Sequence, residues 1–171
     1  MNLLVKLMST GFEKIGSDYR LQNHWIRRLI AFIIDSIIVG IGTLIISIPF
    51  TIAAAATGLP WFFFNPFIGP FFIGILSVLY FALLEYSYGW TFGKRIMNLE
   101  ITRTDGQKPS LDATFIRSIS KIYWILVLLD VIIGLATPGD PHQKVTDRVA
   151  GTTVVSAASP HASPPLSPPT P

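Results

Sequence analysis

The chain lacks cysteine and has few charged residues. Of its 171 residues, 13% are charged and none is cysteine, whereas an average soluble domain has about 25% charged residues. The absence of cysteine excludes disulfides and cysteine-based metal or redox sites. Half of the residues are apolar, and the mean hydropathy is +0.53. Because a soluble domain of this length needs more polar surface, the composition indicates a membrane protein.

The chain also lacks a concentrated excess of one charge and a recognisable catalytic constellation. Its 13 basic and 10 acidic residues give a net charge of +3, too little to predict nucleic-acid binding. The three histidines, His24, His142 and His161, do not have metal-ligand spacing on one helix. No serine, threonine or lysine stands in a known nucleophile context. We therefore expect no metal, no cofactor, no nucleic-acid partner and no enzymatic activity.

What the chain does contain is long apolar stretches. They run from Leu29 to Ile48, from Pro66 or Phe67 to Glu85, and from Ile116 to Ala136. A helix of about 20 apolar residues crosses the hydrocarbon core of a bilayer, so the first two stretches predict transmembrane helices. The fold class that we predict is an all-α membrane protein. It is a small bundle of two to three transmembrane helices with a short cytoplasmic β-hairpin-like loop.

The third stretch and the first connection are less regular. The third stretch contains Arg117, Lys121 and Asp130, and a charge near a helix centre costs about 2.5 to 3.5 kcal/mol. This stretch either spans the membrane or forms a tilted or re-entrant element packed on the others. The connection from Pro49 to Asn65 contains prolines, a glycine and an aromatic run, so we predict a loop in the membrane interface.

The distribution of basic residues predicts the orientation. Five precede the first span, none separates the first span from the second, and four follow the second. By the positive-inside rule, the N-terminus and the loop 86–114 are cytoplasmic in a multi-pass protein of the cell membrane. Lys144 and Arg148 near the C-terminus favour the inside as well, which fits a re-entrant third stretch.

Three regions differ in composition. In residues 1–23, apolar side chains recur at helical spacing, which predicts an amphipathic segment at the inner membrane face or a helix packed on the spans. Residues 24–155 form the membrane domain. Its segment 97–104, followed by the turn signal Asp105–Gly106, and the segment 151–155 both resemble strands that could pair. Residues 156–171 contain six prolines and four serines, which predicts a disordered tail.

Asp35 is the most informative charge because it lies inside the first span. Arg28 precedes it by seven residues, so both project from nearly the same helix face, about 10 Å apart. One interpretation is an ion or proton site, and the other is a charge network that only locks the helices.

Glu85 marks the end of the second span. Asp130 is nine positions from Lys121, too far along one helix for direct pairing, so we expect its partner to come from elsewhere.

The segment Gly89–Arg95, with the sequence GWTFGKR, superficially resembles a phosphate-binding loop. Only three residues separate its glycines, and Arg95 stands where such a loop needs serine or threonine. The segment therefore predicts a glycine-flanked turn with basic anchors rather than a nucleotide site.

Several of these segments together resemble the RDD family of membrane proteins. WIRRLIAFIID from Trp25 to Asp35 is similar to the opening signature of that family, GWTFGKR to its turn after the next span, and HQKVTDRVAGTTVV from His142 to Val155 to its closing pattern. The similarity covers residues 24–155 in the family's order. Two residues depart from the closing pattern: Thr146 replaces the usual histidine, and His142 replaces the usual arginine.

The resemblance implies that Arg28, Asp35 and Asp147 are the arginine and the two aspartates that give the family its name. It implies an integral membrane protein that transports or exchanges small ions or solutes, including a cation or a proton. The alternative is a structural or assembly protein whose Arg/Asp network locks the helices. The partners that we expect are the lipid bilayer and either further copies of the chain or another membrane protein. The secondary candidate residues are Arg27, Gly93, Lys94, Arg95, Lys121 and Asp130.

Overall fold

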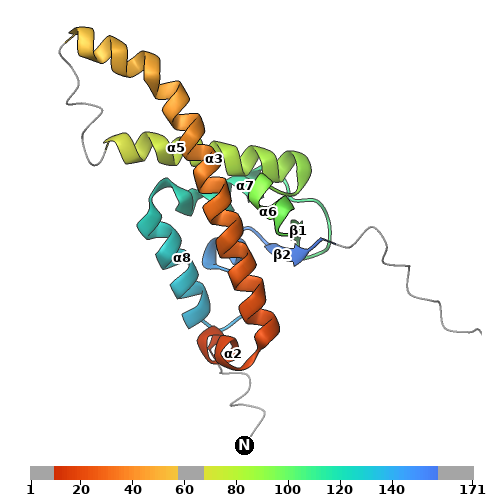
Figure 1. Ribbon diagram of the computed structural model, residues 1–171. Helices are drawn as coiled ribbons and strands as arrows, with labels where there is room; N and C mark the ends of the chain where they lie inside the picture. Colours follow the sequence, from red (N-terminus) through yellow and green to blue (C-terminus); the bar gives the residue numbers. More distant parts are fainter. Residues whose placement is uncertain (1–9, 58–67, 158–171) are drawn as a thin grey trace, which may run out of the picture.

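The computed structural model describes residues 10–57 and 68–157, and these are mostly helical (Figure 1). Two helices among the described residues are long and apolar enough to cross a membrane. The remaining elements are short helices and a two-stranded sheet. In chain order the elements are α2 (Gly11–Ser17), α3 (Tyr19–Thr57), α5 (Ile68–Tyr88), α6 (Phe92–Ile96), β1 (Leu99–Arg103), α7 (Leu111–Ser118), η1 (Ile119–Ile122), α8 (Trp124–Ala136), α9 (Val145–Val149) and β2 (Thr152–Ser156).

Helix α3 contains the first predicted span but extends well beyond it. It has 39 residues and continues through Pro49 to Thr57, so the predicted loop from Pro49 is wrong as far as Thr57. Proline is tolerated in an apolar helix because neighbouring groups can satisfy the freed backbone, and the alanines of 53–56 favour helix. The rest of that predicted loop, residues 58–65, lies outside the described residues.

Helix α5 confirms the second predicted span and ends at Tyr88, three residues beyond the predicted end. It crosses α3 and packs against η1 (Figure 1). The backbones of α5 and η1 come close at Gly74, where an added Cβ would overlap the backbone of Ile122. Glycine is therefore required at this crossing.

The third apolar stretch is bent rather than straight. The pair α7–η1 meets α8 at an angle of 114°, and Tyr123 between them is extended (φ −133°, ψ 139°). Helix α7 packs on α5 and α9, while α8 runs back toward α2, where the Cβ of a substituted Gly11 would approach the backbone of Leu135. Arg117 of α7 lies in the protein interior, where it is 1% exposed.

The sheet joins two segments that are far apart in the chain. β1 and β2 are antiparallel, with Leu99 opposite Ser156 and Arg103 opposite Thr152, which confirms the predicted pairing. The turn at Asp105–Gly106 forms, with Gly106 at φ 80°, but the partner of β1 comes from the end of the domain rather than from the next segment. The segments that precede α7 and follow α9 therefore meet in one sheet.

The two ends of the chain are described only in part. Helix α2 packs on α3 and α8, while Phe12 is 48% exposed. The predicted amphipathic pattern before Thr10 and the tail after Ala157 lie outside the described residues. Ser156, the first residue of the predicted disordered tail, is instead the last residue of β2 and pairs with Leu99.

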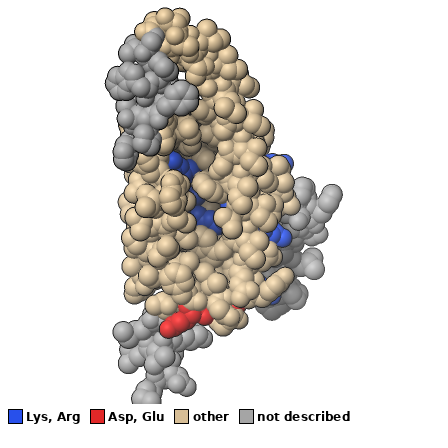
Figure 2. All heavy atoms as spheres, turned by 60° about the vertical axis from the view of Figure 1, so that its left-hand side comes forward, with Lys and Arg blue, Asp and Glu red and all other residues tan. Residues whose placement is uncertain are grey.

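The outer surface of α3, α5 and α8 is apolar. Many large apolar side chains of these helices are exposed, as expected for helices that face lipid. Figure 2 shows a broad face with few charged atoms, where Lys and Arg atoms appear mainly inside a hollow. The charged side chains described next are gathered under this apolar surface.

Candidate functional site

The arginine and the second aspartate implied by the resemblance form a direct ion pair. Arg28 Nη2 of α3 lies 2.6 Å from Asp147 Oδ2 of α9. Arg28 also donates to the carbonyl oxygen of His142 at 2.7 Å, and its guanidinium lies over the ring of Trp25 at 4.7 Å. Asp147 is fully buried, so the pair fixes α9 against the first span.

Arg117 continues this pairing to the second span. Its Nη2 lies 3.1 Å from Asp147 Oδ1, and its Nε lies 3.1 Å from Glu85 Oε2. Although burial opposes ionisation of Asp147, the neighbouring Arg117, Arg28 and Lys144 hold the pKa of Asp147 well below its usual range. Asp147 is therefore an anion held between two arginines.

Lys94 of α6 completes the series through an ion pair with the other oxygen of Glu85. Burial lowers the pKa of Lys94 to about 8, opposed by the negative charge of Glu85, so the lysine remains mainly charged at pH 7. We call this series the ion-pair chain. It connects α3, α9, α7, α5 and α6 through Arg28, Asp147, Arg117, Glu85 and Lys94.

Asp35 occupies a separate site within α3. Its carboxylate accepts hydrogen bonds from the Tyr80 hydroxyl at 2.8 Å, the Thr91 hydroxyl at 2.5 Å and the Gly93 backbone N–H at 2.8 Å. The residue is fully buried. Across the described ranges, no Lys, Arg or His nitrogen lies within 4.0 Å of this carboxylate. Asp35 is therefore bound by neutral donors alone.

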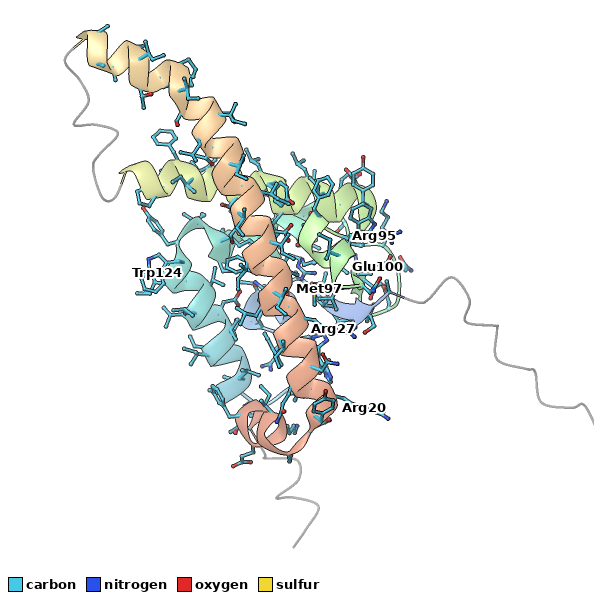
Figure 3. All side chains as sticks on the ribbon, viewed as in Figure 1. Arg20, Arg27, Arg95, Met97, Glu100 and Trp124 are labelled. Atoms are coloured by element: carbon cyan, nitrogen blue, oxygen red, sulfur yellow. The ribbon has the colours of Figure 1, made fainter. Side chains whose placement is uncertain are left out.

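The GWTFGKR segment forms the other half of this site. An added Cβ at Gly93 would overlap the carbonyl oxygen of Ala31 and lie 2.9 Å from Asp35 Oδ2. Thr91 and Gly93 thus face Asp35, while Lys94 reaches the ion-pair chain. Arg95 instead projects outward and lies over Trp90, with 5.2 Å between its guanidinium carbon and the ring centroid (Figure 3).

These positions separate Arg28 from Asp35 and from Arg27. Arg28 does not share a site with Asp35, because its guanidinium is directed to Asp147 and His142. Arg27 forms no ion pair with any described residue, so the adjacent basic residues differ in their contacts. The three residues implied by the resemblance therefore form one ion pair and one separate carboxylate.

Asp130 of α8 finds its partner in another element, as predicted. The Lys144 ammonium contacts the Asp130 carboxylate and the Thr146 hydroxyl, and it donates to the Arg117 carbonyl oxygen at 2.8 Å. The Thr146 N–H donates to Asp130 Oδ1 at 2.8 Å. Burial lowers the pKa of Lys144, opposed by Asp147 and Asp130. This cluster ties the end of the domain to the bend between η1 and α8.

Lys121 is placed differently from the other buried cations. Its Nζ lies 4.3 Å from the centroid of the Phe81 ring and 3.5 Å from the Ser118 hydroxyl. No carboxylate of the described residues lies within 4.0 Å of it. Among those residues, no group of three or more histidine, aspartate or glutamate side chains could hold a metal ion.

Comparison with known families identifies the family of this chain. The model of the RDD family matches residues 23–151. The chain belongs to the RDD family. Together with the apolar helices, this membership indicates an integral membrane protein. Neither the curated proteins nor the solved structures contain a match to the chain.

Several residues around the two sites of this RDD protein cannot be identified from its sequence. The sequence indicates Glu85 only as a span boundary and Arg117 only as a charge in the third stretch, and it does not single out Tyr80 or Thr91. Glu85 and Arg117 each lie at the edge of an apolar stretch, and this is the one signal that could have suggested a buried partner.

Proposed function

We propose that this RDD protein is a membrane exchanger that carries a proton or a small cation on Asp35, with no covalent chemistry. The observation that supports this role is a fully buried carboxylate in a span with neutral donors only. An ionisable group at membrane depth is by default a candidate for an ion or proton pathway. Binding of a proton or cation would neutralise Asp35 without breaking an ion pair.

The ion-pair chain has a different role in this proposal. Both oxygens of Glu85 and both of Asp147 already lie within ion-pair distance of a cation, so a transported ion would have to compete with the arginines and the lysine for these carboxylates. The ion-pair chain connects five elements and would hold Thr91 and Gly93 in place against Asp35. We therefore assign Arg28 and Asp147 to positioning.

We also propose how the protein assembles and how it is oriented in the membrane. Two crossing helices and one bent pair are too few to enclose a path easily, so we propose a homo-oligomer or a complex with another membrane protein. The basic residues favour a cell-membrane location with a cytoplasmic N-terminus. The exposed apolar residues of α3, α5 and α8 provide surface for both lipid and a neighbouring copy.

The test is proton flux in proteoliposomes that contain a pH-sensitive dye, driven by a sodium or potassium gradient. We expect Asp35→Asn to abolish cation-driven flux, since the amide cannot exchange a proton yet can still accept hydrogen bonds. Asp105→Asn is the matched control, because Asp105 is an exposed carboxylate in the loop after β1. Melting temperature in detergent shows whether each variant is folded.

A second candidate function is supported by the same three donors. They come from α5 and the segment around α6, so Asp35 could serve only to join these elements to α3. A purely structural or assembly protein would show no flux in the unsubstituted form, and Asp35→Asn would lower the yield of folded protein. The two functions therefore predict different results in one pair of measurements.

A further inference from the structure

A cavity lies between α3, α5 and the bend that precedes α8. Its volume is about 240 Å³, and its lining is apolar except for a few groups. Ser36 and Gly40 line it from α3, Ser77 and Phe81 from α5, and Trp124 from the start of α8. Lys121 is the one charged residue in the lining. Figure 2 shows Lys or Arg atoms inside a hollow of a face whose other charged atoms lie at its edges, and Figure 3 shows Trp124 at the edge of the bundle.

Among the described residues, Lys121 has no carboxylate within 4.0 Å that could neutralise it. The carboxylate that attracts it most, Glu85, is already paired with Arg117 and Lys94. The hydroxyls of Ser36 and Ser77 donate to carbonyl oxygens of their own helices, at 2.7 and 2.8 Å. Lys121 is therefore the one basic residue among those that line the cavity, and a charge in an apolar setting needs a partner.

The position of the cavity determines which anions can reach it. Its α3 residues extend from Phe32 to Gly40, which is about 6 to 18 Å beyond Arg28 along the helix axis. Exposed apolar side chains such as Ile33 and Ile37 flank this part of α3. An occupant would therefore enter from the lipid phase and needs an apolar body. The small volume favours one alkyl chain over two.

We propose that this cavity binds a long-chain fatty acid anion. Its carboxylate pairs with Lys121, and its chain lies along the apolar walls contributed by α3, α5 and α8. The proposal is independent of ion exchange at Asp35, because Asp35 does not line the cavity.

The test is saturable binding of radiolabelled palmitate to the purified full-length protein in neutral detergent. Lys121→Met removes the charge at similar volume, and we expect it to weaken binding about ten- to a hundredfold. Lys121→Arg should retain most of the affinity. Lys108→Met is the control, because Lys108 is exposed and outside the cavity.

A second pair of variants tests the location. Gly40 lines the cavity, Gly42 does not, and an added Cβ would meet no atom within 4 Å at either position. Gly40→Leu should block palmitate binding, whereas Gly42→Leu should leave it unchanged. Because neither glycine is packed, this pair remains informative even if Lys121→Met fails to fold.

Competitors and one further variant complete the test. Unlabelled palmitate should displace the label, while hexadecanol and dioleoyl phosphatidylglycerol should compete poorly. Equal competition by hexadecanol, stronger competition by the phospholipid, or normal binding to Gly40→Leu would each overturn the proposal. Asp35→Asn should bind palmitate normally, so loss of ion exchange and loss of this site are distinguishable.

Discussion

Arg27 and Arg28 are neighbours of the same type, yet the structure gives them different environments. Arg28 is paired with the buried Asp147 at 2.6 Å, and its side chain is 10% exposed. Arg27 has no ion pair with a described residue. Removing one partner of a buried pair leaves the other charge uncompensated, which is strongly destabilising.

We therefore predict that Arg28→Ala lowers the free energy of unfolding by about 3 to 5 kcal/mol, while Arg27→Ala changes it by about 0.5 kcal/mol or less. The measurement is thermal unfolding of both variants in the same detergent. Equal melting temperatures for the two variants would contradict the assignment of Arg28 as the structural arginine.

The ionisation of Asp147 makes the stability of the folded protein depend on pH. Its pKa is held well below the usual range by Arg117, Arg28 and Lys144, which outweigh its burial. An aspartate in the unfolded chain takes up a proton near pH 4, about the model-peptide value. Below that pH the unfolded state binds more protons than the folded state, so stability falls.

We expect the melting temperature of the unsubstituted protein to fall as the pH is lowered from about 5 to 3. The contribution of Asp147 is fully present above this window. Asp147→Asn should show a smaller fall over the same window, and Asp105→Asn, at an exposed position, should behave like the unsubstituted protein. A fall in melting temperature of the same size in Asp147→Asn would show that Asp147 is not the source of the pH dependence.

At the residue scale, the sequence indicated single charged residues as candidates but not most of the pairs that they form. Asp35, Arg28 and Asp147 were identified from a charge inside a span and from the family resemblance. Glu85 and Arg117 were not, because their pairing depends on the packing of α7 against α5, which no spacing along the chain reveals.

At the scale of elements, apolar length predicted both spans, and strand patterns predicted the sheet. The prediction failed at Pro49, where an apolar environment permits a proline inside α3. The charges of the third stretch correctly indicated an irregular element. The 114° bend itself could not be derived, since it depends on the partners that Arg117 and Lys121 find in α5.

The bend has a consequence for topology that can be measured. β1 and β2 pair, so the segments that precede α7 and follow α9 lie together, and we propose that α7–η1 and α8 return to the side on which they began. The absence of native cysteine allows labelling of single introduced thiols in intact vesicles. We predict that Ser17→Cys, Gln107→Cys and Ala157→Cys react from one side of the membrane and Thr57→Cys from the other. Labelling of Ala157→Cys from the side of Thr57→Cys would mean that the third stretch spans.

At the scale of the whole molecule, the scarcity of charge has a structural explanation. Most exposed side chains on α3, α5 and α8 are apolar, while the ion-pair chain, the Lys144–Asp130 cluster and Asp35 lie beneath them. The ion-pair chain is already compensated by its own members. Asp35 and Lys121 differ because neither has an opposite charge within 4.0 Å among the described residues.

Cation-driven proton flux in proteoliposomes, compared between the unsubstituted protein and Asp35→Asn, tests the central claim most directly. The account predicts flux in the unsubstituted protein and in Asp105→Asn, and none in a folded Asp35→Asn variant. Unchanged flux in Asp35→Asn, or no flux from the unsubstituted protein with either sodium or potassium, would contradict it.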